Sequence, residues 1–486
     1  MPPPRFSASA VLPAAAALAL LLAVTSGRYG YHRDELYFLT LRPAWGYVDQ
    51  PPFTPWLART VAELSPTLPV LRLPALVLAT ASVLVVAAIS REVGGGRLAQ
   101  GLAAWGYAFG TFTLTFGHVL LTASVDLLVW PTVLLLVLRA LRRGQPAWWL
   151  PAGLLVGLST FNKWLVVLLV LSVLAGLLAV GPRRVLVSRA VLGAAALALL
   201  GALPNLVWQV RHGLPQLAMG QALSAENAGD VRVTAVPLLL VAVGPLAVPV
   251  WLAGVVALLR RPEWRPVRFL APALGVIVVL TVLGGSQVYY PYGVLAAVFA
   301  VGCVPVAELA GRGRGARRLV LGLAGLHVLS GVLISGSVLP LDVLARTFVP
   351  AANQAIGDQV GWPAYVAQVD RVTATARTSD PSVAVLASNY GEAGALLRFS
   401  SLPEVPVVSG LNALWDQGGP PPGTRTLVVV GGQLRDAAPL FTSCSVVDRL
   451  DNGVGIDNEE QGEPVAVCTG PRQDWDHLWP ALRHLG

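Results

Sequence analysis

Three carboxylates and several aromatic side chains lie together near the N-terminus, between the first two apolar segments of the chain. Asp34, Glu35 and Asp49 fall within HRDELYFLTLRPAWGYVDQPP, residues 32–52. A carboxylate that is held beside a reacting hydroxyl can accept its proton, which makes it a candidate general base. The alternative is a solvated loop in which the acidic pair only caps a short helix. This stretch is therefore the first candidate site, with proton transfer as its expected chemistry.

Other candidates are single charged residues at the ends of apolar segments. Lys163, in FNKW, is the only lysine among 34 basic residues, and its compact ammonium suits a phosphate oxygen. Asp126 stands in the first turn of a predicted helix, where the helix dipole alone favours a carboxylate. A binding role and a capping role are both open for Asp126.

Aromatic and basic residues further along the chain complete the set of candidates. Arg211 and His212 stand in WQVRHGLPQL, and Tyr289 and Tyr290 stand in SQVYYPYG. A guanidinium can clamp a phosphate, and a tyrosine can hydrogen-bond to it or stack on a sugar. All four residues also have the character of anchors at a membrane interface. A divalent metal ion held by His212 together with Asp49 or Asp126 is left open, although no His-x-x-x-His spacing accompanies it.

Membrane-spanning helices must position these residues. Of the 486 residues, 55% are hydrophobic and 12% are charged, about half the charged fraction of a typical soluble protein, and the mean hydropathy is +0.65. The first apolar segment also has features of a signal peptide, but the many segments that follow favour an uncleaved helix. Eleven spans are predicted within a domain over residues 1–340: 8–26, 69–90, 98–117, 122–141, 147–161, 164–181, 189–209, 234–259, 267–284, 289–309 and 318–338.

Arginines are concentrated in the loops that follow the even-numbered spans. Groups of them stand at 139–143, 183–189, 260–268 and 312–318. Basic loops stay on the cytoplasmic side, so the N-terminus is predicted to be cytoplasmic in a multi-pass protein of the cell membrane. The net charge of +8 thus reflects topology, and no nucleic acid partner is expected.

The candidate residues all fall on the opposite, extracytoplasmic side of these spans. A transporter or lipid flippase would place paired ionisable groups inside its spans, commonly within inverted repeats, and the sequence indicates neither. An active site at the outer surface, in contact with membrane lipids, is therefore favoured. A transporter or flippase remains the alternative function, and an inactive assembly subunit is a third.

The chain from 341 to 486 is less apolar and is predicted to form a separate extracytoplasmic α/β domain. VAVLASNYGEAGALLRF predicts a strand, a turn and a helix, and TRTLVVVGG predicts another strand. Glu392, in the turn, is interpreted as a helix-capping carboxylate, with acceptor binding as the alternative. Cys444 and Cys468 can form a disulfide in an oxidising compartment, whereas Cys303 lies inside a span.

Six segments, in their order and spacing, resemble the GT-C glycosyltransferases. The resemblance extends over about residues 8 to 340 and is strongest to the dolichyl-phosphate-mannose protein mannosyltransferases (family 39) and their bacterial relative, the lipid A aminoarabinose transferase. It implies an all-α polytopic GT-C membrane fold with a C-terminal extracytoplasmic α/β domain. The segments are HRDELYFL, GYVDQPPFTPWL, TASVDLLVWPTVLLLVLRAL, GLSTFNKWLVVLL, LPNLVWQVRHGLPQL and SQVYYPYGVLAAVFA.

The resemblance also implies an activity. A sugar, mannose or a related hexose or pentose, would pass from a polyprenyl-phosphate donor to a hydroxyl acceptor on a protein, glycan or lipid. Asp34 would be the base of a single inverting displacement, and Glu35 would orient it or the acceptor. Gln50 stands where several relatives have lysine. The donor- and phosphate-binding residues would be Asp49, Asp126, Lys163, Arg211, Tyr289 and Tyr290.

Overall fold

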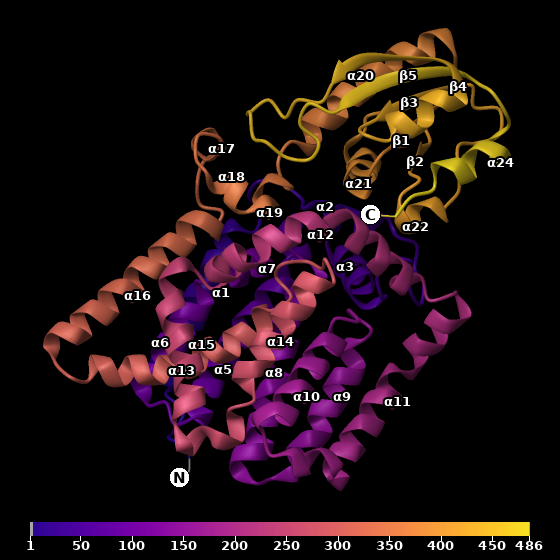
Figure 1. Cartoon of the computed structure of the whole chain (residues 1–486). Coiled ribbons are helices and arrows are strands. Elements are labelled where there is room, and N and C mark those ends of the chain that lie inside the picture. Colours follow the sequence, from indigo (N-terminus) through magenta and orange to yellow (C-terminus); the bar gives the residue numbers. More distant parts are fainter. Residues whose placement is uncertain (1–2, 486) are drawn as a thin grey trace. The chain divides into compact units, whose positions relative to one another are not determined.

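The chain folds into two compact units (Figure 1). The computed structural model describes residues 3–485, with side chains at all positions except 226–228 and 230. The helical unit contains the residues up to Ser26, together with Gln50–Phe53 and Arg72–Gly336. The mixed unit contains Gly27–Asp49, Thr54–Leu71 and the residues from Ser337 onward.

Each of the eleven predicted spans contains a helix or a pair of helices. Breaks separate α6 from α7 and α12 from α13, where Gly110 and Gly244 precede the second member of the pair. The helices are α1 (Ala8–Thr25), α5 (Leu73–Glu92), α6 (Arg97–Ala108), α7 (Thr111–His118), α8 (Thr122–Arg143), α9 (Trp149–Ser159), α10 (Val166–Val180), α11 (Arg189–Arg211), α12 (Pro215–Ala242), α13 (Val248–Arg260), α14 (Leu270–Leu283), α15 (Tyr292–Ala310) and α16 (Arg314–Ser335).

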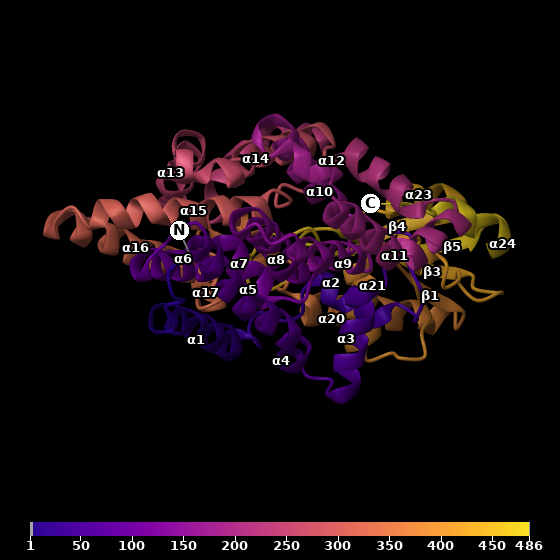
Figure 2. The same cartoon turned by 90° about the horizontal axis from the view of Figure 1, so that it is seen from below.

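Helix α15 forms the centre of the helical unit. Every residue from Val294 to Val301 is buried, as expected for a helix that is apolar on all sides. It packs against α5, α6, α8 and α13. Figure 2 shows α13 and α14 on one side of this core and α1 on the other. Small residues permit close packing elsewhere: a Cβ on Gly302 would lie 1.9 Å from the carbonyl oxygen of Val250 in the neighbouring segment.

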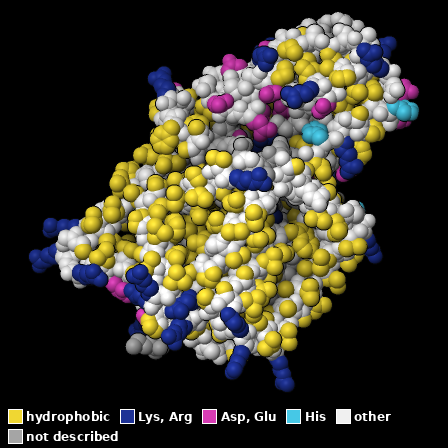
Figure 3. Space-filling view, viewed as in Figure 1, with side chains coloured by type: hydrophobic (Ala, Val, Ile, Leu, Met, Phe, Trp, Pro, Cys, Tyr) yellow, Lys and Arg dark blue, Asp and Glu magenta, His cyan; other side chains and the backbone are white. Residues whose placement is uncertain are grey.

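The surface of the helical unit is apolar. Large side chains such as Leu199, Leu200 and Leu203 on α11 are more than half exposed, and yellow apolar atoms cover much of the unit in Figure 3. In the described part of the chain, seven helices are long and apolar enough to cross a membrane, or eight if the bent pair Val231–Ala242 and Pro245–Arg260 is one span. The expected all-α, multi-pass membrane protein is confirmed.

The mixed unit contains a five-stranded sheet in the order β2-β1-β3-β5-β4. Strands β1 and β3 are buried along their whole length, which explains their uninterrupted apolar sequences. The first three strands are parallel and the last two antiparallel to their neighbours, and α20 (Trp362–Ser379) and α21 (Tyr390–Phe399) pack against the sheet. The predicted α/β character is confirmed. The strands are β1 (Val383–Ala387), β2 (Val407–Val408), β3 (Thr426–Val430), β4 (Phe441–Arg449) and β5 (Pro464–Pro471).

The three cysteines are placed as the sequence predicts. Cys444 on β4 and Cys468 on β5 are directly opposite each other and form a disulfide. Cys303 is free and buried in α15. A disulfide of this kind is expected in an extracytoplasmic compartment.

We expect denatured, unreduced protein to accept one maleimide label and reduced protein to accept three. Cutting the bond with a Cys444→Ser/Cys468→Ser double substitution should lower the free energy of unfolding of the mixed unit by about 3 kcal/mol, because the unfolded chain loses a constraint. Mass spectrometry counts the labels on each sample. The control is Cys303→Ser, which should remove the one label that is present both before and after reduction. Three labels without reduction would contradict the bond.

Two segments from the N-terminal part of the sequence belong to the mixed unit. They contain α2 (Arg33–Thr40), most of α3 (Phe53–Leu64) and α4 (Leu68–Leu71). The indole N–H of Trp362 donates to the carbonyl of Tyr31 at 3.0 Å, and Arg398 donates to the carbonyl of Pro66 at 2.8 Å. The acidic stretch is thus held by the C-terminal part of the chain.

Candidate active site

Helix α2 presents the acidic pair through a capping box. The His32 imidazole accepts the backbone N–H of Asp34 at 3.1 Å, and the Glu35 carboxylate accepts the backbone N–H of His32 at 2.8 Å. Glu35 is fully buried, whereas Asp34 is partly exposed. The two neighbouring carboxylates therefore differ in environment: Glu35 fixes the first turn of α2, and Asp34 is left at the surface of that turn.

A second contact of α2 fixes Asp49. The buried Tyr37 hydroxyl donates to Asp49 Oδ1 at 3.0 Å. Burial and the Asp49 charge raise the pKa of Tyr37 well above its usual value, so the hydroxyl keeps its proton. The sequence left open a metal ion shared by Asp49 and His212, and it did not indicate Tyr37 as a partner of Asp49. The structure links it to Asp34 through one turn of the same helix.

Residues of the C-terminal region surround the acidic pair. The Tyr390 hydroxyl, on the first residue of α21, makes a hydrogen bond with the Asp34 carboxylate. The Arg33 guanidinium lies 5.0 Å from the centre of the Tyr390 ring and donates to Glu459 at 3.0 Å. A second carboxylate oxygen, on Glu460, lies 3.9 Å from the same guanidinium. Sequence reasoning missed these residues because they are more than 300 positions from α2.

Glu392 is the capping carboxylate that the sequence predicts. It accepts the backbone N–H of Ser388 at 2.7 Å, while the Asn389 side chain accepts the N–H of Glu392 at 2.9 Å. Burial, followed by the nearby charge of Glu460, raises the pKa of Glu392 to about 8. Burial also raises the pKa values of Glu460 and of Asp358.

These raised pKa values predict that the mixed unit loses stability as pH rises. Glutamate in an unfolded chain titrates near pH ~4.3, whereas Glu392 in the folded chain titrates near 8. In this interval the folded state holds a proton that the unfolded state lacks, so the free energy of unfolding falls with increasing pH. Melting temperatures measured across this range should decline, and Glu392→Gln should reduce the slope. An equal slope in both proteins would contradict the assignment.

In the helical unit, four predicted residues lie close together, and three of them, Asp126, Tyr289 and Tyr290, line one cavity. The Lys163 ammonium donates to the Tyr289 hydroxyl at 3.1 Å and lies 5.3 Å from the centre of the Tyr290 ring. Asp126 accepts from the Asn162 amide at 3.3 Å and interacts electrostatically with Lys163. A lysine, a carboxylate and two tyrosines thus form one constellation, and Asn162 is a member that sequence reasoning missed.

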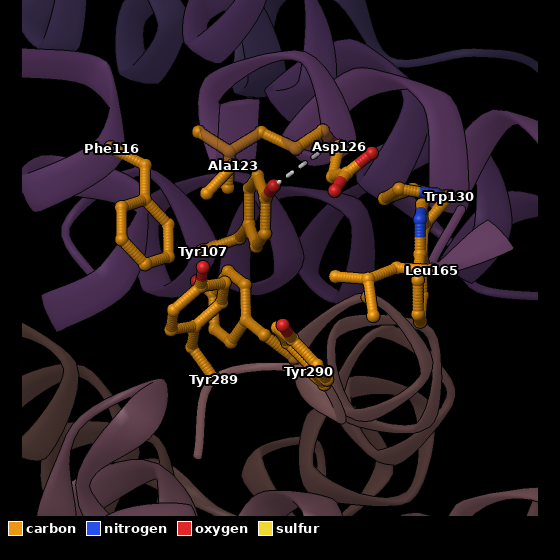
Figure 4. A pocket seen from close by; sticks show the side chains of 12 residues that line it. Tyr107, Phe116, Ala123, Asp126, Trp130, Leu165, Tyr289 and Tyr290 are labelled. Atoms are coloured by element: carbon orange, nitrogen blue, oxygen red, sulfur yellow. Dashed lines mark hydrogen bonds between the residues drawn. The ribbon is translucent and has the colours of Figure 1, made fainter. Parts of the chain in front are cut away.

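The cavity, together with the open solvent at its mouth, has an empty volume of about 360 Å³. Figure 4 shows Asp126 above it, with Tyr289 and Tyr290 facing it from the opposite side. Its walls are mainly aromatic and aliphatic, with few polar groups, as is common for pockets that bind small molecules. Its lining residues include Tyr107, Phe116, Asp126, Trp130, Leu165, Tyr289 and Tyr290.

Arg211 and His212 are not part of this constellation. Both are exposed at the end of α11, and neither lines the cavity. His212 stacks on Trp208, with 4.3 Å between ring centres, and interacts with its carbonyl at 2.7 Å. The anchoring interpretation accounts for His212. Among residues 3–485, no group of three or more His, Cys, Asp and Glu side chains is arranged to hold a metal ion.

Known proteins resemble this chain in sequence and fold. A family model described as dolichyl-phosphate-mannose-protein mannosyltransferase matches residues 49–208, and no curated protein matches by sequence. ArnT from Cupriavidus metallidurans bound to undecaprenyl phosphate is 15% identical, with a TM-score of 0.58 over 95% of this chain and 98% of ArnT. This chain has the GT-C fold. The resemblance noted in the six sequence segments is confirmed.

Other GT-C structures agree with this assignment. ArnT from the same organism without ligand is 16% identical, with a TM-score of 0.52 over 94% of this chain and 97% of ArnT. The arabinofuranosyltransferase AftD from Mycobacteria is 13% identical, with a TM-score of 0.52 over 96% of this chain and 40% of AftD. The chain thus corresponds to less than half of AftD. The GT-C fold accounts for both the spans and the sheet-containing unit that follows them.

Proposed function

We propose that this protein is a membrane glycosyltransferase that moves a sugar from a polyprenyl-phosphate donor to a hydroxyl acceptor. The constellation of Asp126, Lys163, Tyr289 and Tyr290 carries the proposal, because Lys163 contacts two tyrosines that line an apolar cavity. An anionic phosphate matches the ammonium, and an isoprenoid matches apolar walls. The solved ArnT structure with undecaprenyl phosphate supports a donor of this class.

Lys163 is the proposed contact of the donor phosphate. Negative charge grows on this phosphate as the glycosidic bond breaks, so a fixed cation stabilises the transition state more than the ground state. Tyr289 and Tyr290 hold the ammonium in place and offer hydroxyl groups to the donor. Asp126 balances the lysine charge when the site is empty. Arg211 is exposed and has at most a peripheral role in drawing the anionic donor to the protein.

Asp34 is the proposed general base. An acceptor hydroxyl is a weak nucleophile, and a carboxylate that takes its proton during attack makes a single, inverting displacement feasible. Glu35 orients Asp34 through the capping box, and Asp49 is held by Tyr37 on the same helix. The proposed topology places the N-terminus in the cytoplasm and the mixed unit outside, where a disulfide can persist.

Incubation of the purified, detergent-solubilised protein with a panel of polyprenyl-phosphate sugars tests the proposal. The panel should include mannose, other hexoses and pentoses, each with protein, glycan and lipid acceptors. Release of polyprenyl phosphate together with a glycosylated acceptor is the expected result. Transbilayer movement of the donor in proteoliposomes, without any release, would instead favour the alternative of a lipid flippase.

A further inference from the structure

The first turn of α21 meets the first turn of α2 at unusually short range. A Cβ on Gly394 would lie 2.9 Å from the Leu36 backbone, and a Cβ on Gly391 would lie 2.9 Å from the Arg33 side chain. Larger residues at these two positions would force the helices apart. Both helices belong to the mixed unit, and their labels are adjacent in Figure 1. The two glycines therefore permit contacts that bring a C-terminal side chain onto the acidic turn.

Tyr390 is the side chain that this close packing places beside Asp34. Its hydroxyl is hydrogen-bonded to Asp34, and its ring lies 4.7 Å from the ring of Tyr37, centre to centre. Tyr37 in turn donates to Asp49. One residue of the C-terminal region thus contacts Asp34 directly and supports the residue that holds Asp49.

Burial and the charged groups around Tyr390 keep its hydroxyl protonated. Burial, followed by the charge of Asp34, raises the pKa of Tyr390, so its hydroxyl remains a donor to the carboxylate. The Arg33 guanidinium lies over the Tyr390 ring, 5.0 Å from its centre, and is itself held by acidic partners. The titratable groups of this network are His32, Arg33, Asp34 and Tyr37 from the α2 region, Asp358 from the segment before α20, Glu392 on α21, and Glu459 and Glu460 from the loop before β5.

From this geometry we propose that Tyr390 is a positioning residue for the base: its hydroxyl orients the Asp34 carboxylate toward the acceptor hydroxyl whose proton it takes. The proposal rests on the proposed function and extends it, because it gives the C-terminal unit a part in catalysis. A hydrogen bond from a neutral donor to a carboxylate favours the ionised form. Removing the hydroxyl should therefore alter both the geometry and the pH range in which Asp34 can accept a proton.

The test is the pH dependence of polyprenyl-phosphate release by Tyr390→Phe. We expect kcat to fall about tenfold, KM for the donor to stay within twofold, and the acid limb of the pH–rate profile to move up by about one pH unit. Tyr365→Phe is the matched control, since that buried tyrosine of the same unit donates to Asn458 and not to Asp34. A Tyr390→Phe profile that superposes on the wild type would overturn the proposal.

A ring-fluorinated tyrosine at position 390 separates loss of the hydroxyl from a general folding defect in Tyr390→Phe. It keeps the shape and hydroxyl of the residue but is a stronger donor, so the acid limb should move to lower pH, opposite to the shift in Tyr390→Phe. Shifts in the same direction for both variants would reject the positioning role. Failure of the proposed function is distinguishable, because the wild-type protein would then release no polyprenyl phosphate from any donor.

Discussion

Asp34→Asn should lower the rate of sugar transfer about 1,000-fold while leaving the protein folded. Asparagine has nearly the same shape as aspartate but cannot take a proton from the acceptor, and general-base catalysis typically contributes 10²–10⁴-fold. The substitution keeps the backbone N–H that His32 accepts, so the capping box of α2 survives. Single-turnover release of polyprenyl phosphate, measured with saturating donor and acceptor, isolates this step.

The matched control for this loss is Asp436→Asn. Asp436 is an exposed aspartate of the mixed unit, in α23 (Leu434–Ala437), so the same change in charge and shape occurs away from the acidic stretch. We expect its rate to match the wild type within twofold. Full turnover by Asp34→Asn under the same conditions would remove Asp34 from the role of base and leave the GT-C fold without an assigned catalytic carboxylate.

Lys163→Met should cause the second largest loss, about 100-fold in kcat/KM for the donor. Methionine retains the length and apolar body of the side chain but removes the charge that stabilises the departing phosphate, an interaction worth roughly 10²–10³-fold in comparable sites. The Tyr289 hydroxyl also loses the hydrogen bond that it accepts from Lys163. Steady-state kinetics over a range of donor concentrations checks the prediction.

Two further variants make the lysine result specific. Lys163→Arg keeps a positive charge but changes its shape, so it should recover part of the activity. Arg317→Met, which removes one exposed charge from α16, should leave the kinetics unchanged. Equal losses in Lys163→Met and Lys163→Arg would indicate a packing defect, and an undiminished Lys163→Met would contradict phosphate binding at this cavity.

The sequence was most informative about features with a strong local signal. Apolar segments of bilayer length predicted the helices because a backbone in lipid must satisfy its own hydrogen bonds. The lone lysine and the tyrosine pair were each predicted as contacts of the donor, and the structure places them beside one another. The strands β1 and β3 were evident from their continuous apolar runs.

Long-range placement was not accessible in the same way. Nothing in the local pattern around Tyr390 indicates that its hydroxyl contacts Asp34. That contact depends on Gly391 and Gly394, which permit α2 and α21 to pack closely. Arg211 shows the opposite case. Its residue type and its position at a span end suggested phosphate binding, yet the helix leaves it exposed and away from the cavity. Residue type and spacing thus identified candidates, while packing selected among them.

The ion pair between Arg33 and Glu459 has a consequence for biosynthesis. These residues are 426 positions apart, so at roughly 5–20 residues per second the ribosome completes Glu459 about 20 to 85 s after Arg33. Throughout that interval the first loop has been translated, whereas Glu459, its partner in the ion pair, has not. The nascent chain therefore cannot complete the contacts around Asp34, the proposed base, until translation is nearly finished.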